Sequence, residues 1–238
     1  MPDVIYEKQD HIAHVTLNRP ESLNAYRGQT FKDLEAIWNT VNSDDDVWVA
    51  IMTGAGRAFC AGMDLKAAPG DGVSGIRRFD DYDDQIEVGK PIIAAINGYC
   101  YGGGLSIAIA CDIRIAAEGA TFAEPQVKRG IIGPHSTRRL LDVLPRAIAM
   151  ELMLTGDPIN AQEAYRVGLV NAVVPLPDLM PAATAMAERI CQNAPLAVWA
   201  AKESALGFTT RHSYVQSGDV AEGRKAFAEK RTANFQGR

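Results

Sequence analysis

The chain has 238 residues, of which 47% are hydrophobic and 22% are charged, and its net charge is −5. This balance is typical of a globular protein with enough apolar residues to fill a sizeable core. The negative net charge, and the lack of a basic stripe interleaved with aromatic residues, argue against a dedicated nucleic-acid-binding protein.

The N-terminal quarter of the chain predicts a hairpin, a helix and a buried strand. Residues 4–18 alternate between apolar and polar positions on both sides of a tight turn near residues 9–10, which indicates two hairpin strands. Residues 28–44 carry apolar side chains at helical spacing. Residues 47–54 form a short, continuously apolar run, which is typical of a strand buried on both faces of a parallel-type sheet.

The remaining segments continue this alternation of strands and helices. Residues 67–90 are rich in Gly and Asp and predict a mobile loop that leads into a helix. Residues 91–97 predict a second buried strand, followed by a helix that begins near Gly103. Residues 112–125 supply two short extended pieces, and helical patterns dominate from about Ser136 onward. The order predicts an α/β core with a helical appendage.

Three consecutive glycines, 102–104, stand at the start of the helix-like run that follows the second buried strand. Each glycine is about 0.5–1 kcal/mol less favourable in a helix than alanine, so three together need a physical reason. A helix N-terminus presents unpaired N–H groups and a partial positive charge, which suit an oxyanion that can approach the backbone closely. Tight packing of the helix on the sheet would also explain the glycines.

A second turn of small residues favours the ligand-binding interpretation. The segment GRAFCAGMDLK, residues 56–66, follows the first buried strand, and ligands of open α/β sheets collect at the ends of strands. Two such turns can each donate one N–H to the same oxygen. A thioester carbonyl needs two converging donors as it becomes an enolate.

Five segments in order resemble the crotonase superfamily, also called the enoyl-CoA hydratase/isomerase superfamily: HVTLNRPESLNA (14–25), GRAFCAGMDLK (56–66), and residues 90–125, 154–175 and 226–235. The resemblance implies a ββα superhelical (spiral) α/β core over residues 1–190 and a C-terminal helical trimerisation region over 191–238. It implies an enzyme of fatty acid metabolism that acts on an acyl-CoA thioester. Coenzyme A then enters as part of the substrate, no separate cofactor is needed, and the protein is a homotrimer or a dimer of trimers.

The resemblance also assigns roles to individual positions. The backbone N–H groups of Met63 and Gly103 match the oxyanion hole. The expected CoA contacts are Asn24, Ala25, Ala61, Gly62, Asp64, Leu65, Phe227 and Lys230, of which the last two match tail positions that reach the CoA of a neighbouring subunit. Lys230 is also one of several charges that an ordinary solvated helix face would carry.

Two positions depart from the pattern of the family. The resemblance implies that hydratases of this family need two glutamates. One lies a helical turn after the oxyanion glycine, and the other lies just after a later proline. Here Ser106 and Gln126 occupy the matching positions. Hydration of an enoyl thioester needs a base for the water and an acid for the α-carbon, and neither side chain is a carboxylate. We therefore do not expect a standard hydratase.

Other side chains are candidates for proton transfer. Histidine is the side chain that ordinarily titrates near neutrality, which makes His135 a candidate, and the resemblance places it in a loop that borders the acyl pocket. It also fits a surface histidine beside a helix capped by Ser136 or Thr137. Glu124 is two residues from Gln126, so in an extended segment both face the same side, and a register slip restores one carboxylate.

The sequence suggests three candidate functions. The first is a crotonase-family lyase or isomerase on an acyl-CoA, including decarboxylation or C–C hydrolysis of a β-keto or malonyl-type thioester. The second is an acyl-CoA-binding protein without catalytic activity. The third, a dinucleotide-binding oxidoreductase, is disfavoured because Phe59 stands where the third glycine of GxGxxG belongs.

Cysteine usage and the N-terminus set the expected environment. The four cysteines contain no CxxC pair, so we expect neither a zinc site nor a disulfide framework, and no metal. The charged start MPDVIYEKQD does not fit a signal peptide, and the apolar runs are too short to cross a membrane. We therefore expect a cytoplasmic protein without a membrane or nucleic-acid partner.

Overall fold

The computed structural model describes residues 1–66, 88–132, 134–208 and 214–238, with the backbone alone for residues 134–137. The strands are β1 (Val4–Gln9), β2 (Ile12–Leu17), β3 (Val49–Gly54), β4 (Ala58–Cys60), β5 (Ile92–Ile96), β6 (Tyr99–Tyr101), β7 (Ile113–Ala117), β8 (Thr121–Ala123), β9 (Ile159–Asn160) and β10 (Ala172–Val174). The α-helices are α1 (Gly28–Ser43), α3 (Gly103–Ala110), α4 (Pro134–Val143), α5 (Arg146–Thr155), α6 (Ala161–Arg166), α7 (Leu179–Cys191), α8 (Pro195–Leu206) and α9 (Gly218–Glu229). Short 3-10 helices span Pro20–Ser22 (η1), Pro125–Arg129 (η3) and Leu176–Asp178 (η4).

The strands form two sheets. The larger sheet has the order β1-β2-β3-β5-β7-β10, and the smaller sheet has the order β4-β6-β8-β9. The β1–β2 hairpin is antiparallel, with Val4 opposite Leu17, and every other pair in the larger sheet is parallel. In the smaller sheet, β8 and β9 are antiparallel and the other pairs are parallel.

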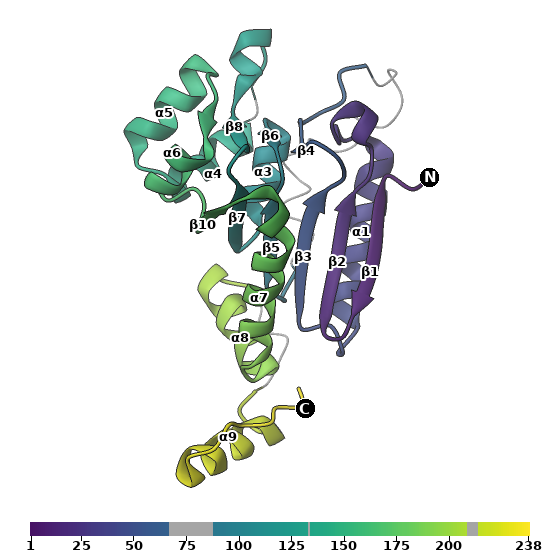
Figure 1. The fold of residues 1–238 in the computed structure, drawn as a ribbon, viewed down its shortest axis with the longest axis vertical. Helices are drawn as coiled ribbons and strands as arrows, with labels where there is room; N and C mark the ends of the chain where they lie inside the picture. Colours follow the sequence, from purple (N-terminus) through teal and green to yellow (C-terminus); the bar gives the residue numbers. More distant parts are fainter. Residues whose placement is uncertain (67–87, 133, 209–213) are drawn as a thin grey trace.

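The chain winds between the two sheets as a spiral. Strands β3, β5 and β7 lie in the larger sheet, and each is followed by a strand of the smaller sheet, β4, β6 or β8. Helix α3 follows β6 and completes a ββα unit (Figure 1). This winding confirms the predicted ββα spiral. It also brings the ends of β4 and β6, which are neighbours in the smaller sheet, to the same side of the molecule.

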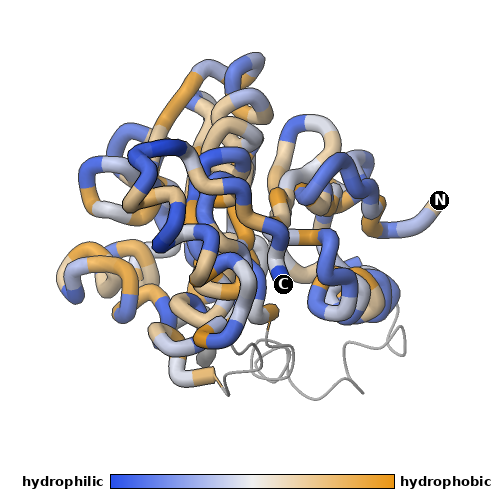
Figure 2. The backbone as a smooth tube through the Cα atoms, turned by 90° about the horizontal axis from the view of Figure 1, so that it is seen from below, coloured by the Kyte–Doolittle hydropathy of each residue, from blue (hydrophilic) through white to orange (hydrophobic). Residues whose placement is uncertain are grey.

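Alternation along the strands separates two apolar cores. Ala50 and Met52 of β3 face the larger core, which includes the buried sides of α1 and α3. Val49 and Ile51 face a second core on the opposite side of the sheet, where α7 packs. Both faces of the central strands are thus covered, as expected of a parallel sheet. Hydrophobic and hydrophilic stretches alternate along most of the tube in Figure 2, which fits elements that bury one side.

Helix α8 is joined to the core by a buried lysine. Lys90 is fully buried, its Nζ donates to the Asp44 carbonyl at 2.6 Å, and it lies 4.5 Å from the ring centroid of Trp199. The Trp199 indole in turn donates to the Trp48 carbonyl at 3.0 Å. Burial is the main reason that the pKa of Lys90 is lowered to about 8.

Helix α9 lies at the far end of the molecule from α3 (Figure 1). The tail after α9 folds back on this helix, because Asp219 accepts the N–H groups of Gln236 and Gly237 at 2.7 and 2.9 Å. Arg231 binds both carboxylate oxygens of Glu222 at 2.6 and 2.8 Å. These contacts give the C-terminal segment a fixed shape.

Most predicted elements are confirmed, including the hairpin, the buried strands and the helix that begins at Gly103. Strands β9 and β10 were not expected, because both are short and belong to a region with helical patterns. Most of the predicted loop over 67–90 lies outside the described residues. The division at residue 190 falls within α7 and stays a prediction.

Candidate active site

Two turns leave neighbouring strands of the smaller sheet and meet. Cys60, the last residue of β4, pairs with Cys100 of β6, so the chain leaves both strands at the same edge. The first turn carries Gly62 and Met63, and the second carries the glycines that open α3. We call the first the Met63 turn (residues 61–65) and the second the Gly103 turn (residues 102–104).

The backbones of these two turns are in contact. Gly62 has φ +94°, and a Cβ built on it would lie 2.9 Å from the Tyr101 carbonyl oxygen and 3.4 Å from the Gly103 nitrogen. A Cβ built on Gly103 would lie 2.2 Å from the Tyr26 hydroxyl oxygen. The glycines are therefore required because backbone approaches backbone on one side and the Tyr26 ring on the other.

The amide of Met63 is aimed by a bridge to residue 26. Tyr26 donates its N–H to the Gly62 carbonyl and accepts from the Asp64 N–H, both at 2.9 Å, in a parallel bridge with Met63. In such a bridge the N–H of the central residue points away from the partner strand. The Met63 N–H therefore points to the side opposite Tyr26.

The amide of Gly103 opens a helix. Gly103 is the first residue of α3, after the N-cap Gly102 at φ +55°. N–H groups in the first turn of a helix have no acceptor within that helix. Within the described residues, neither the Gly103 N–H nor the Met63 N–H donates to a protein acceptor. Two donors with spare hydrogen-bonding capacity thus stand on adjoining turns.

Asn24 supports this site from within the protein. Its side chain is 2% exposed, accepts the Arg19 N–H at 2.8 Å and donates to the carbonyls of Ala55 and Ala58 at 2.9 and 2.7 Å. The side chain therefore holds the loop before α1. Leu65, in contrast, is 57% exposed.

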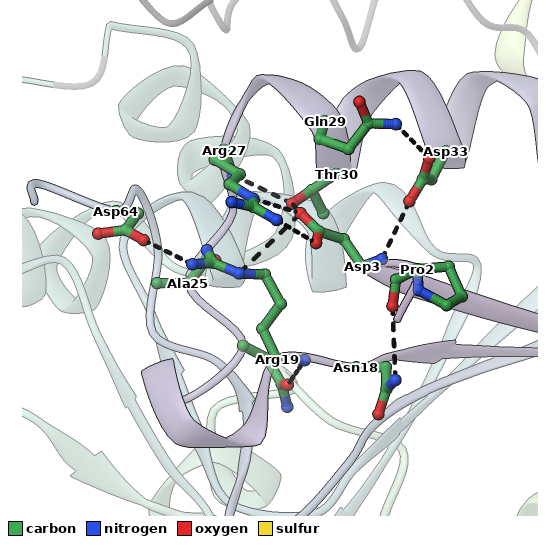
Figure 3. A network of polar contacts seen from close by, with 11 residues as sticks. Pro2, Asp3, Asn18, Arg19, Ala25, Arg27, Gln29, Thr30, Asp33 and Asp64 are labelled. Carbon is green, nitrogen blue, oxygen red and sulfur yellow. Dashed lines mark hydrogen bonds and ion pairs between the residues drawn. The ribbon is translucent and has the colours of Figure 1, made fainter. Parts of the chain in front are cut away.

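A polar network surrounds this loop (Figure 3). Asp3 is bound by the Arg27 guanidinium at 2.8 Å through both carboxylate oxygens, and Thr30 donates to it at 2.8 Å. These contacts, with the Arg27 hydrogen bond the strongest influence, hold the pKa of the Asp3 carboxyl below its ordinary value. Arg19 lies beside this cluster and binds Asp64 of the Met63 turn at 2.9 Å.

Ser106 and Gln126 both lie against Gly102. Ser106 is 3% exposed, and its hydroxyl donates to the Gly102 carbonyl at 3.5 Å. The Gln126 amide approaches from η3, and its Nε2 would lie 3.5 Å from a Cβ at Gly102. The Gln126 Oε1 atom is buried and has no hydrogen-bond partner within the described residues. The side chains at the two positions where the resemblance predicts glutamates in hydratases thus both lie against Gly102, at the start of α3.

The expectation for Glu124 is wrong in one respect. Pro125 begins the 3-10 helix η3, so the segment from Glu124 to Gln126 is not extended, and the two side chains do not share one side. Glu124 is 2% exposed. Burial above all, with charges that include Glu124, holds the pKa of the Cys100 thiol well above its ordinary value. Glu124 thus lies near Cys100, and it directly follows Ala123, whose carbonyl accepts the N–H of Gly102 in the Gly103 turn at 2.8 Å.

His135 belongs to α4, but its side chain lies outside the described residues. The expected cap is wrong, because α4 begins at Pro134 and residues 136 and 137 are inside the helix. Phe227 and Lys230 are at the end of α9, far from α3 in the same chain (Figure 1). Phe227 is 88% exposed. One protomer therefore does not bring these two tail residues to the Gly103 turn.

Two further residues contact these turns. The sequence allows Tyr26 either to pack in the core, which is favoured, or to hydrogen-bond an acyl group; it is 4% exposed, and its hydroxyl also lies against Gly103. Arg19 was part of a matching motif without an assigned role. The glycine at 103 signals a close neighbour, but the sequence does not say which residue it is.

The part of the chain that the structure describes holds neither a metal-binding cluster nor a membrane-spanning helix. No group of three or more His, Cys, Asp or Glu side chains there is arranged to hold a metal ion. None of the described helices has the length and apolar character needed to cross a membrane.

The ββα spiral matches solved structures over its full length. The crystal structure of enoyl-CoA hydratase from Mycobacterium tuberculosis H37Rv superposes with a TM-score of 0.91 at 38% identity and covers 100% of both chains. The fold is therefore that of the crotonase superfamily.

Sequence comparison leads to the same group. Residues 7–238 match the family model for Enoyl-CoA hydratase/isomerase. The chain is 40% identical over 253 residues to (E)-benzylidenesuccinyl-CoA hydratase from Thauera aromatica, covering 98% of this chain and 99% of the relative. It is 39% identical over 251 residues to carnitinyl-CoA dehydratase from Proteus mirabilis, covering 95% of each. The chain belongs to the enoyl-CoA hydratase/isomerase family.

Proposed function

We propose that this protein is an enzyme that acts on an acyl-CoA thioester and stabilises an enolate in an oxyanion hole. The N–H groups of Met63 and Gly103 are the two donors. The observation that carries the proposal is the contact between the two turns: a Cβ built on Gly62 would lie 3.4 Å from the Gly103 nitrogen. Preorganised donors of this kind stabilise charge that develops in the transition state more than charge in the substrate.

CoA runs along the backbone of residues 24–25 and 61–65. Asn24 supports this path by holding the loop with its buried side-chain amide. Phe227 and Lys230 contact the CoA of a neighbouring subunit, as in a homotrimer or a dimer of trimers. The exposure of Phe227 and its distance from α3 in its own chain support this placement (Figure 1).

The proposed reaction is not standard hydration. A hydratase must take a proton from water, and the positions beside Gly102 offer a hydroxyl from Ser106 and an amide from Gln126. An amide is not a base at neutral pH, and a serine needs an adjacent base. Gln126 Oε1, buried without a partner in the described residues, is instead placed to accept a hydrogen bond from a substrate or from a water molecule.

Decarboxylation or C–C hydrolysis of a β-keto or malonyl-type thioester is the second candidate. Loss of CO₂ leaves its electron pair on the α-carbon and so creates the enolate without a general base. The oxyanion hole stabilises this enolate, which then takes a proton. His135, and Glu124 next to the Ala123 carbonyl that binds Gly102, are the candidate proton donors, and the lack of a carboxylate at positions 106 and 126 supports this reaction.

The test is a panel of CoA thioesters incubated with the purified protein. Crotonyl-CoA, a malonyl-type thioester and a β-keto thioester are followed by ultraviolet absorbance and mass spectrometry. We expect tight binding across the panel and turnover of a substrate other than crotonyl-CoA. Turnover of crotonyl-CoA at ordinary hydratase rates would refute the interpretation of Ser106 and Gln126. Binding without turnover of any thioester would instead identify a non-catalytic acyl-CoA-binding protein.

A further inference from the structure

Arg19 connects residues 24–25, on the proposed CoA path, with the Met63 turn (Figure 3). Its Nη1 donates to the Ala25 carbonyl at 2.5 Å, and its Nη2 donates to Asp64 Oδ2 at 2.9 Å. The side chains of Arg19 and Asp64 are 13% and 14% exposed, so the ion pair is largely shielded from water. The guanidinium of Arg19 therefore links the two segments of the proposed CoA site, residues 24–25 and 61–65.

Asp64 is held from several directions. Its N–H donates to the Tyr26 carbonyl at 2.9 Å, its Oδ2 accepts from Arg19, and its Oδ1 accepts the Lys66 N–H at 3.0 Å. Asp64 directly follows Met63, so these contacts fix the peptide plane on the C-terminal side of the proposed donor. The carboxylate that sequence comparison suggested as a CoA contact is occupied by protein groups.

We propose that Arg19 is a positioning residue of the oxyanion hole: by binding the Ala25 carbonyl and Asp64 together, it holds the segment before Tyr26 against the Met63 turn, where the Tyr26 N–H binds the Gly62 carbonyl and so orients the peptide plane that carries the Met63 N–H. This inference rests on the proposed function. Arg19 does not touch the reacting atoms, and it acts through Asp64 and the bridge between Tyr26 and Met63. A planar guanidinium suits this task because it offers several donors in a rigid fork, whereas lysine is a point charge on a flexible stem.

Arg27 is a matched control in the same network. Its guanidinium binds both oxygens of Asp3, each at 2.8 Å, and its side chain is 38% exposed. Those contacts join β1 to the start of α1 and do not involve Asp64 (Figure 3). Removal of either arginine breaks a buried or half-buried ion pair, but only Arg19 is joined to the Met63 turn.

The test measures the carbonyl stretching frequency of bound butyryl-CoA that is isotope-labelled at the thioester carbon. Butyryl-CoA is saturated and cannot be hydrated, so the frequency reports hydrogen bonding in the oxyanion hole alone. In the unaltered protein the frequency should fall below that of the free thioester in water. We expect Arg19→Met to return it toward the free value, Arg19→Lys to give an intermediate value, and Arg27→Met to leave it unchanged.

A catalytic readout accompanies the spectrum. With whichever thioester the unaltered protein turns over, Arg19→Met should lower kcat by about 10²-fold, since misplacement by about 1 Å has an effect of that size. Arg27→Met should change kcat far less than Arg19→Met. If Arg19→Met does not fold, Asp64→Asn, which keeps the shape and removes the charge, should still weaken the carbonyl shift.

The outcomes separate the two proposals. A carbonyl shift in the unaltered protein that persists in Arg19→Met, or in Asp64→Asn where Arg19→Met does not fold, overturns the role of Arg19 and leaves the oxyanion hole intact. Equal loss of the shift in Arg19→Met and Arg27→Met also overturns it, because the effect is then a general one. Absence of any shift in the unaltered protein overturns the oxyanion hole itself.

Discussion

Replacement of Gly103 by alanine is the most direct test of the site. A Cβ at this position would lie 2.2 Å from the Tyr26 hydroxyl oxygen, 2.6 Å from Cε1 and 2.7 Å from Cζ. The hydroxyl oxygen and two ring carbons are all closer than real Cβ contacts, so a small movement of the hydroxyl alone cannot relieve the overlap. Tyr26 is 4% exposed and packs 5.0 Å from Phe31 between ring centroids, so its ring has little room to move.

Two effects of different size are expected for Gly103→Ala. Overpacking of a well-filled site typically costs about 1–3 kcal/mol of stability. If the Gly103 turn moves instead, its N–H leaves the thioester oxygen, and loss of one such donor lowers kcat by about 10²–10³-fold. We expect the loss in kcat to dominate, because α3 begins at this residue and can shift at its end.

The assay compares Gly103→Ala with Gly119→Ala. Gly119 has open space around a built Cβ and no positive φ, so the control makes the same chemical change without a steric conflict. Both variants are measured for kcat on the thioester that the panel identifies, for the carbonyl frequency of bound butyryl-CoA and for thermal stability. If Gly103→Ala matches Gly119→Ala in kcat and in carbonyl frequency, the assignment of this amide to the oxyanion hole is wrong.

Three further predictions concern pH. The hydrogen bond from Arg27 lowers the pKa of Asp3 below its ordinary 3.8. The stability that this ion pair contributes is therefore complete above pH 3.8 and is lost as the pH falls through the lower folded pKa. Acid unfolding followed by circular dichroism should show a smaller acid-dependent loss of stability in Asp3→Asn than in the unaltered protein. Burial lowers the pKa of Lys90 from 10.5 to about 8, so the unfolded chain binds more protons between these values and stability should rise with pH there, by up to about 3 kcal/mol. Denaturant titrations at pH 8 and pH 10.5 check this, and a rise that persists in Lys90→Met would contradict it. The Arg231 hydrogen bond lowers the pKa of Glu222 from 4.5 to about 2, so the protection of amides in the C-terminal tail, measured relative to their intrinsic exchange rates, should fall as the pH falls from 4.5 toward 2. Protection that does not change with pH would argue against this contact.

Local patterns in the sequence predicted the elements that carry the site. The continuously apolar run 47–54 and the glycines at 102–104 indicated a buried strand and a ligand-facing helix start, and the structure confirms β3 and the beginning of α3. These predictions succeeded because each depends on residues that are close in sequence. The backbone conformation needed at Gly62 and Gly102 likewise follows from glycine itself.

Contacts between distant segments were not predictable in the same way. Tyr26 meets Gly103 across 77 positions of the chain, and Arg19 meets Asp64 across 45, so only the completed spiral brings them together. The orientation of Glu124 was misjudged for a local reason, because Pro125 begins a 3-10 turn where an extended segment was expected. A proline in that position favours a turn as well as a strand end, and a single sequence does not decide between them.

The proposed donors are main-chain groups, and this has a consequence for the history of such a protein. A point mutation can remove a side chain, but every residue except proline retains its peptide N–H. The Met63 amide therefore survives almost any replacement at its own position, whereas a replacement at 106 or 126 changes the chemical group itself. With donors of the proposed kind, a few changes in neighbouring side chains can alter the reaction while both donors are kept.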